Sequence, residues 1–199
     1  VVTGRKEGVF AFGGNTPVFN QKGDQLFTIA GINRTEVKSC DLNTGQERLV
    51  FQDTSRIETM AVSPDGRRIV TAGRNIKIWD LDTGVELLNL RGHRNTVTAV
   101  GFSLDGSHVV SGDENAEVRI WDVRGEQHAN TQGVHVGGVW CVAFSSDGKH
   151  IVSGGNGDLK IWDANTLQET ITLKGHGKHV MSVAFSPDGK RIVSGSIDK

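Results

Sequence analysis

Histidine and serine recur along this chain at a spacing that suggests catalytic chemistry. His93, His135 and His176 each stand nine residues before a phenylalanine, and a serine follows each of them in the next apolar run. Together with an aspartate, histidine and serine form the triad of many hydrolases, in which one exposed serine attacks a carbonyl beside an oxyanion site. Here the same trio returns about every 41 residues. Because a catalytic site is a single constellation, this recurrence predicts a buried hydrogen-bond web in each repeat and no enzyme.

Two other chemistries are disfavoured by spacing. The segment SGGNGD (153–158) resembles glycine-rich nucleotide and calcium loops, but it precedes a strand, so no helix N-terminus is available to hold a phosphate. The histidines are too dispersed for a recognised set of metal ligands. We therefore expect no metal and no cofactor.

Three Trp-Asp pairs carry the period, with Trp79, Trp121 and Trp162 spaced 42 and 41 residues apart. Within one period, short runs rich in β-branched residues, such as TVTAVGF, HVVSG and EVRIWDV, alternate with turns such as SPDG. In such a turn proline sets φ at the second position, aspartate caps the backbone and glycine accepts a positive φ. No segment has convincing helical periodicity, so the pattern predicts an all-β chain with about four short antiparallel strands per repeat.

The repeats also predict how the chain is divided. The pattern of residues 17–31 (PVFNQKGDQLFTIAG) is similar to that of residues 60–73 (MAVSPDGRRIVTAG). This similarity indicates a degenerate first repeat, in which Cys40 takes the place of tryptophan. Each sheet is apolar on both faces and unstable alone, so the sheets should pack against one another radially. The expected parts are an N-terminal strand in 1–14 that closes or flanks the array, a degenerate blade 15–53, blades 54–91, 92–133 and 134–174, and an incomplete blade 175–199.

Composition disfavours several classes of protein. Basic and acidic residues number 22 and 23, a balance that gives no general attraction to nucleic acid or anionic membranes. No apolar run approaches the roughly 20 residues that cross a bilayer, and VVTGRKEGVF lacks the pattern of a signal peptide. Cys40 and Cys141 lie in apolar runs, which predicts buried thiols in a reducing compartment. We therefore expect an intracellular protein, cytoplasmic or nuclear, with no membrane partner.

A Gly-His pair about 28 residues before a Trp-Asp pair, with turns such as FSPDG between them, resembles the WD40 family of β-propellers. GHRNTVTAVGFSLDGSHVVSGDENAEVRIWD (92–122) carries the pattern, and the resemblance extends over 15–199. It implies a WD40-type β-propeller of four-stranded antiparallel blades, here partial, with about four and a half blades. It also implies a non-catalytic scaffold whose loop face and channel mouth hold other proteins or peptides within a larger complex.

The resemblance further implies a web of loop histidine, strand serine or threonine, turn aspartate and tryptophan in each blade. Asn115 stands in the aspartate's place in the third repeat, Asp158 is the nearest match in a shorter turn of the fourth, and Asp53 replaces histidine in the second. On this interpretation no repeat holds the full set. The web residues are His93, Ser111, Trp121, His135, Ser153, Trp162, His176, Ser194, Asp198, Thr71 and Trp79.

The positions at which the repeats differ indicate where partners bind. One position in the first strand of each repeat varies, and in a propeller it lies near the loop face by the central channel. Aromatic, methionine and arginine side chains are typical of interface hot spots. The alternative is that Trp140 and Met181 only fill space between blades. The candidate partner-binding residues are Glu58, Arg94, Asn95, Thr98, Trp140, Lys178, His179 and Met181.

Basic pairs follow three of the DG turns, namely 67–68, 149–150 and 190–191, and would share one rim. Each lies beside an aspartate, and no exposed aromatic residues interleave for base stacking, so nucleic acid is the less favoured partner. One alternative function is a ribosome-biogenesis subunit for pre-rRNA processing with an RNA-contacting basic rim, because VFAFGG is similar to the opening of such WD-repeat subunits. Another is a sensor or regulatory propeller attached to an enzyme on a longer chain.

The final segment, RIVSGSIDK (191–199), ends within a repeat. One interpretation is that these residues are part of a longer propeller, and the other is a five-bladed ring closed by GVFAF (8–12) as an outer strand. We expect the first, with unpaired strand edges that favour association.

Overall fold

The computed structural model describes residues 17–124, 129–133, 135–166 and 168–198, with main chain alone for 129–133. Throughout these residues the regular elements are β-strands and none is a helix, which confirms the predicted all-β class. The strand expected in 1–14, including GVFAF (8–12), lies outside the described residues.

The strands form successive antiparallel meanders, in which each strand pairs with the next along the chain. The first sheet contains β1 (Val18–Phe19), β2 (Gln25–Ala30), β3 (Glu36–Asp41) and β4 (Glu47–Gln52). The second sheet contains β5 (Ile57–Val62), β6 (Arg68–Gly73), β7 (Ile76–Asp80) and β8 (Glu86–Leu90). The third sheet contains β9 (Val97–Phe102), β10 (His108–Asp113), β11 (Glu117–Asp122) and β12 (Ala129–Gly133).

The last five strands are joined into one sheet: β13 (Cys141–Phe144), β14 (His150–Gly154), β15 (Asn156–Asp163), β16 (Glu169–Phe185) and β17 (Ile192–Ser196). The first part of β16 pairs with β15 and completes the fourth sheet, and 180–185 pairs with β17. We call this last unit, which comprises 175–198 and is built on the pairing of 180–185 with β17, the terminal pair. The sequence places a boundary between 174 and 175, whereas β16 runs through it without a break because its backbone ladder continues as far as the pairing of Asn156 with His179.

The DG turns between the first two strands of a repeat share one construction. In the second sheet Ser63 Oγ donates to Asp65 Oδ1 at 2.5 Å and the amide of Gly66 donates to Ser63 O at 2.9 Å. Gly66 adopts a φ of +70°, a conformation that side chains with a Cβ rarely take. The same bonds recur around Asp105, Asp147 and Asp188. The predicted turn chemistry therefore fixes where each hairpin reverses.

The hydrophobic core is divided among the spaces between sheets. On β6, Ile69 packs with residues of the first sheet while its neighbour Val70 packs with residues of the third. The alternation repeats on β10, where Val109 contacts the second sheet and Val110 the fourth. Each of these four side chains is fully buried, with 0% of its surface exposed. Burying one valine or isoleucine stabilises the fold by roughly 1.5–3 kcal/mol. Both faces of a sheet are thus apolar because each has a neighbouring sheet.

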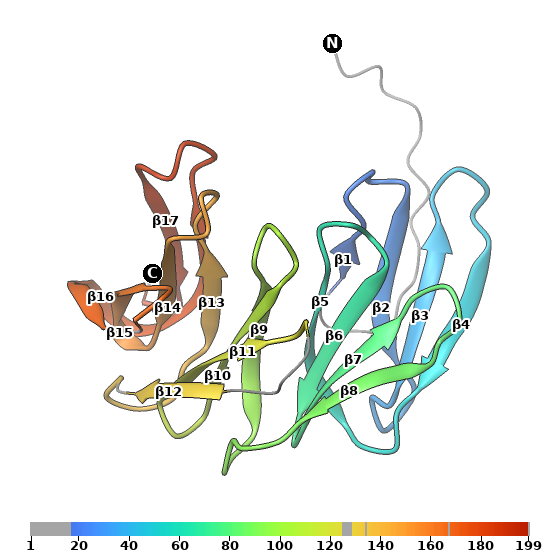
Figure 1. Cartoon of the computed structure of the whole chain (residues 1–199), viewed down its shortest axis with the longest axis horizontal. Coiled ribbons are helices and arrows are strands. Elements are labelled where there is room, and N and C mark those ends of the chain that lie inside the picture. Colours follow the sequence, from blue (N-terminus) through green and yellow to red (C-terminus); the bar gives the residue numbers. More distant parts are fainter. Residues whose placement is uncertain (1–16, 125–128, 134, 167, 199) are drawn as a thin grey trace.

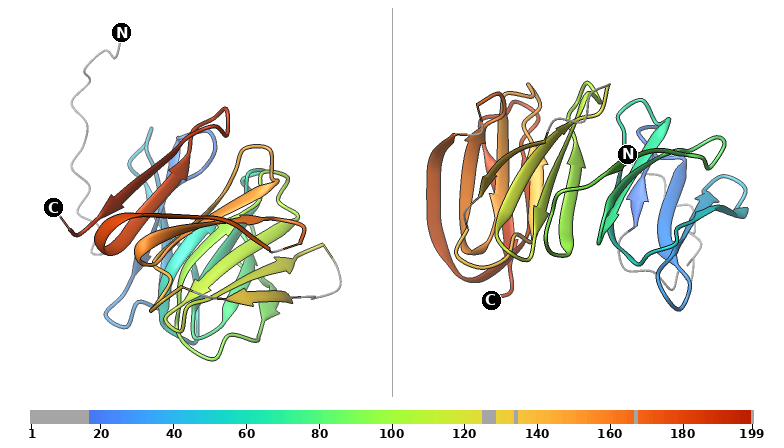
Figure 2. Two further views of the ribbon diagram at one scale, coloured as in Figure 1. Left: turned by 90° about the vertical axis from the view of Figure 1, so that its left-hand side faces the viewer. Right: turned by 60° about the horizontal axis from the view of Figure 1, so that its bottom comes forward.

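The sheets lie side by side in an arc, with the first sheet and the terminal pair at its two ends (Figure 1, Figure 2). Along the inner edge β5, β9, β13 and β16 neighbour one another in turn. The described residues form an open part of a propeller, in agreement with the predicted partial ring, and not a closed five-bladed one.

Candidate functional site

The third sheet holds a complete web of histidine, serine, aspartate and tryptophan. His93 Nε2 lies 2.7 Å from Ser111 Oγ, and Trp121 Nε1 donates to the same hydroxyl at 2.8 Å. His93 Nδ1 lies 2.9 Å from Asp113 Oδ2. The carboxylate is therefore Asp113, and the placement of Asn115 in this role is wrong.

The position of Asp113 follows from the turn that joins β10 to β11. Asp113 Oδ1 accepts the amides of Asn115 and Glu117 at 3.0 and 2.9 Å, which fixes the carboxylate with Oδ2 toward the histidine. Spacing counted along the chain does not reveal which residue of such a turn faces the histidine.

The fourth sheet repeats the same web. His135 lies 2.6 Å from Ser153 Oγ and 2.9 Å from Asp158 Oδ1, and Trp162 Nε1 donates to Ser153 Oγ at 2.8 Å. The shorter turn thus still places Asp158 against the histidine. Two repeats hold the full set, which corrects the sequence-based interpretation that none does.

The second sheet and the terminal pair hold variants of the web. Trp79 Nε1 donates to Thr71 Oγ1 at 2.8 Å. In place of a histidine, buried Asp53 forms an ion pair with Lys77, whose Nζ lies 2.7 Å from Asp53 Oδ1. Burial lowers the pKa of Lys77, but its bonds to Asp53 and Glu86 raise it by more, so the lysine stays charged. Sequence reasoning missed Lys77, because Arg119 and Lys160 stand at the same distance before their tryptophans and nothing in the pattern pairs Lys77 with Asp53.

In the terminal pair, His176 lies 2.9 Å from both Ser194 Oγ and Asp198 Oδ2. The amide of Gly177 also donates to Asp198 Oδ2, at 2.8 Å. The His176 side chain is 28% exposed, compared with 2% for His93 and 0% for His135. The same three residue types are therefore in place, but they are only partly covered.

The geometry of the webs favours neutral histidine. The tryptophan donates to the serine oxygen, so the serine hydroxyl can donate onward to Nε2 only if that nitrogen carries no proton, while Nδ1–H donates to aspartate. In agreement, burial lowers the pKa of His93 and His135 against the opposing effect of their carboxylates. Ser111 and Ser153 are 0% exposed, so a substrate carbonyl cannot reach either hydroxyl. The trio here is architectural.

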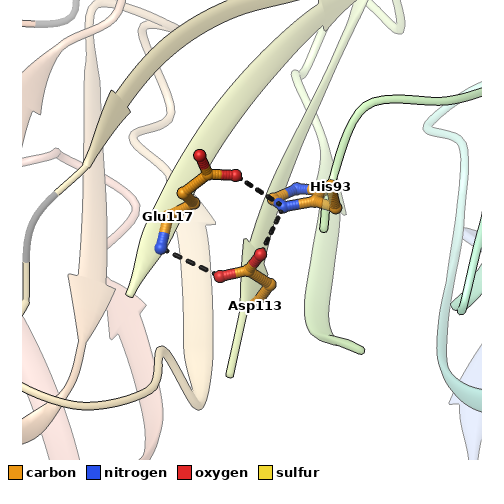
Figure 3. Close-up of side chains that lie close together, drawn as sticks. All are labelled: His93, Asp113 and Glu117. Atoms are coloured by element: carbon orange, nitrogen blue, oxygen red, sulfur yellow. Dashed lines mark hydrogen bonds and ion pairs between the residues drawn. The ribbon is translucent and has the colours of Figure 1, made fainter. Parts of the chain in front are cut away.

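His93, Asp113 and Glu117 place their potential ligand atoms within 4.8 Å of one another, which is the one such cluster among the described residues (Figure 3). Both nitrogens of His93 are engaged in the web. Glu117 lies 3.6 Å from His93 Nδ1 and pairs with Arg119 at 3.1 Å. Because a metal ion would have to displace the hydrogen bonds that hold the sheet together, we interpret the cluster as part of the web.

The candidate partner-binding residues lie at the starts of the inner strands and in the loops before them. Trp140 is partly exposed, and its Nε1 donates to Asn156 Oδ1 at 3.2 Å. Its ring packs on His179, with centroids 5.1 Å apart. Met181 follows on β16 and is 48% exposed, and Lys178 is exposed as well. The structure therefore joins Trp140 to the terminal pair through His179.

The other candidates are tied more closely to the framework. Thr98 Oγ1 donates to Val139 O and so links the third and fourth sheets. Glu58 accepts from Arg56 Nε at 2.6 Å and pairs with Arg34 at 3.5 Å. Asn95 is bonded to Asn115 at 3.1 Å. Arg34, which sequence reasoning missed, has a φ of +55° and reaches the backbone of Glu58 from the first sheet.

Among the exposed candidates, Arg94 lies in the loop before β9 and its side chain is open to solvent. Lys178, next to His179 in the chain, is likewise exposed. Among the described residues the structure contains no helix with the length and apolar character needed to cross a membrane.

Radially packed four-stranded sheets, of which the third and fourth each have a loop histidine bonded to a buried strand hydroxyl, define this chain as a β-propeller of repeated blades. The profile of the family described as WD40, "WD domain, G-beta repeat", matches residues 45–80, 84–122, 127–163 and 167–199. The chain belongs to the WD40 family.

Known relatives are similar over part of the chain. The target of rapamycin complex subunit wat1 of Schizosaccharomyces pombe is 30% identical over 80 residues, which cover 39% of this chain and 26% of that protein. WD repeat and SOCS box-containing protein 1 of Danio rerio is 36% identical over 105 residues (50% of this chain, 25% of that protein). U3 small nucleolar RNA-associated protein 15 homolog of Bos taurus is 32% identical over 98 residues (48% and 19%). The matched region thus spans about a quarter or less of each relative.

Proposed function

We propose that the chain is a non-catalytic scaffold that holds partner proteins within a larger complex. The proposal fits the family, and two of the similar proteins are named as a complex subunit and as an RNA-associated protein. The buried hydroxyls of the webs oppose a hydrolytic role, because Ser111 and Ser153 are out of reach of a substrate. We also propose an intracellular location, in the cytoplasm or the nucleus.

We infer that the partner contacts the loop surface, defined as Glu58, Arg94, Asn95, Thr98, Trp140, Lys178, His179 and Met181. The observation that carries the proposal is the Trp140 side chain, which is held in place by Asn156 and His179 while part of its ring stays exposed. An aromatic ring that is already ordered loses little conformational entropy on binding, which is typical of hot spots. Met181 and Lys178 extend this surface with an adaptable apolar chain and a positive charge.

The test is quantitative affinity purification with the wild-type chain and with Trp140→Ala and Met181→Ala. We expect stoichiometric partners to fall about tenfold or more with Trp140→Ala and by less with Met181→Ala. Ile32→Ala is the control, because Ile32 is fully exposed in a loop of the first sheet. Equal recovery of every partner by the wild type and both variants would refute the loop surface as the binding site.

A second candidate is the pre-rRNA role, which one observation favours, namely the similarity to the U3 small nucleolar RNA-associated protein. The basic rim supports it weakly. Arg68 is already engaged with Gly106 O at 2.7 Å, and Asp65, Asp147 and Asp188 lie beside the basic pairs. RNA binding that weakens steeply with salt and is lost when Arg67, Arg68, Lys190 and Arg191 become Glu would support this candidate. An absence of binding at low salt would end it.

A further inference from the structure

A groove of about 600 Å³ lies between the third and fourth sheets, at the end of the strands opposite to Trp140. Trp140 directly precedes β13, whereas Phe144 is the last residue of β13 and lines the groove. Leu104 forms one lip and is 60% exposed. The walls also include His108, Asp105 and Asp147. An apolar floor with carboxylates at the mouth is therefore open to solvent on this side.

The neighbouring space between the second and third sheets shows how such a groove is filled. There the guanidinium of Arg68 lies 5.6 Å from the centre of the Phe102 ring, and its Nη2 donates to Gly106 O at 2.7 Å. In the third repeat the position of Arg68 is taken by His108, and Phe144 and Gly148 correspond to Phe102 and Gly106. His108 is shorter, and its Nδ1 lies 2.7 Å from Ser107 Oγ on its own turn.

The groove between the third and fourth sheets therefore has the same aromatic ring and carbonyl acceptor, while among the described residues no arginine lies over Phe144. We propose that the groove binds an arginine side chain of a partner protein, next to an apolar residue that contacts Leu104. The guanidinium would lie over Phe144 and donate to Gly148 O, as Arg68 does one sheet away.

The charges at the mouth favour this occupant. Asp147 accepts its hydrogen bonds from the described residues through Oδ1, from Ser145 Oγ at 2.6 Å and from the amide of Lys149 at 3.0 Å. The lone pairs of Oδ2 are thus available to a second N–H of the guanidinium. Asp105 is held ionised by Ser103 and Ser107, which lower its pKa. Arg124 already pairs with Asp122 at 2.7 Å, so Asp147 is the carboxylate that is left to recognise the ligand.

Leu104 distinguishes this groove from the others in the chain. The corresponding turn positions are Pro64, Ser146 and Pro187, and none of them offers a long apolar side chain. The partner segment is therefore expected to present arginine beside leucine, isoleucine or methionine. Lysine is a poor substitute, because its ammonium lacks the planar face that stacks on Phe144 and the fork that reaches two acceptors.

The experiment titrates the 199-residue chain with an acetylated, amidated tetrapeptide that carries leucine and arginine between two glycines. Binding is followed by amide chemical shifts in two-dimensional NMR. We expect shifts that concentrate at Leu104, Phe144 and Gly148, and an affinity at least about tenfold weaker for the peptide with lysine in place of arginine. Equal affinities, shifts elsewhere or no binding would overturn the proposal.

Two variants locate the site. His108→Arg should fill the groove from within and reduce peptide binding by about tenfold or more, while the thermal midpoint is unchanged or raised. His150→Arg, the same change one sheet further on, is the matched control and should leave binding unchanged. Asp147→Asn should weaken binding several-fold, whereas Asp188→Asn in the equivalent turn should not. Binding that survives both His108→Arg and Asp147→Asn would refute the assignment. Because the loop surface lies at the other strand ends, this result is independent of the Trp140 test.

Discussion

Val152 and Val193 occupy the same position in successive repeats and have opposite surroundings. Both lie one residue before the serine of the web, on β14 and β17, with the sequence Ile-Val-Ser-Gly around each. Val152 is 0% exposed, like its counterparts Val70 and Val110, because the next sheet covers it. Val193 is 67% exposed. Identical local sequence thus produces a core residue or a surface residue according to whether a further sheet lies against it.

The comparison teaches that stability in this fold is distributed over the spaces between sheets. Ile192, which faces the fourth sheet, packs against its core, while Val193 on the other face of the same strand has no such cluster among the described residues. The second, third and fourth sheets are each stabilised from two sides and the terminal pair from one. The loss of stability caused by substitutions at matched positions should therefore depend mainly on whether a neighbouring sheet covers the position.

The largest effect is expected from a charge placed on either face. Val152→Asp buries a carboxylate between two sheets and should lower the free energy of unfolding by more than about 4 kcal/mol. Val193→Asp adds the charge in contact with water and should change it by less than about 0.5 kcal/mol. Urea denaturation followed by circular dichroism measures both. Similar losses for the two variants would show that the face of β17 is covered in solution.

The hydroxyls of the webs give a smaller contrast. Ser153 links His135 and Trp162 in a site that is 0% exposed, so Ser153→Ala leaves two buried polar groups unpaired and should cost about 2 kcal/mol. Ser194 contacts only partly exposed His176, and Ser194→Ala should cost about 0.5 kcal/mol because water can replace the hydroxyl. Native-state hydrogen exchange of the strand amides in each variant measures the two costs. A greater loss at Ser194 would contradict the ranking.

Acid should weaken the covered webs over a defined window. Burial lowers the pKa of His93 and His135 in the folded chain, so the unfolded chain takes up protons at a higher pH than the folded one. Their contribution is complete above the unfolded pKa of about 6.5 and is lost as the pH falls from there toward the folded values. Urea midpoints measured from pH 8 to pH 5 follow this loss.

His135→Gln should flatten that pH dependence while lowering stability at pH 8. The lowered pKa values of Asp105 and Asp147 act in a different window, because their contributions are lost only as the pH falls below about 4. A slope between pH 8 and pH 5 that is the same in His135→Gln and in the wild type would rule out the buried histidine as its source.

The smallest expected difference is in self-association, between a charge on the exposed face of the terminal pair and one on the first sheet. The exposed face of the terminal pair, with Ala184, Val193 and the outer edge of β17, which pairs with no strand of the described residues, should bind weakly to another copy of the chain. Val193→Asp should reduce the association constant several-fold, whereas Leu49→Asp on β4, an exposed strand of the first sheet, should have little effect. Light scattering after size exclusion measures both. Monomeric behaviour of the wild type at high concentration would contradict the expectation.

Much of the web could be predicted from the sequence, and the exceptions are instructive. Serine and tryptophan meet as expected because neighbouring strands of one sheet hold them in a fixed register, with Ser111 opposite Arg119 and Val109 opposite Trp121. The histidine reaches the same hydroxyl from the loop before the sheet. The aspartate was misplaced because the turn after β10 directs Asp113, two residues after Ser111, toward the histidine, whereas in the terminal pair the acceptor is Asp198, four residues after Ser194. The ion pair of Asp53 and Lys77 connects a loop to the following sheet, so the repeat pattern does not predict it.

The interaction surfaces depended on the tertiary structure to a greater extent. The variation between repeats drew attention to Trp140, but its contact with His179 exists only because the terminal pair lies against the fourth sheet. The groove beside Leu104 was not predicted at all. Its walls come from two sheets, and it is open because the side chain of one repeat, His108, is too short to cross to the next as Arg68 does.

The amino-acid sequence by itself determined the strands, the turns and the two-faced apolar character of every sheet, because these follow from local conformational preferences and from a side-chain alternation with period two. Only the tertiary structure decided which faces are covered, which carboxylate each histidine meets and which spaces between sheets stay open. Those outcomes depend on contacts between separate sheets, and two stretches as alike as the ones around Val152 and Val193 carry no local record of their neighbours.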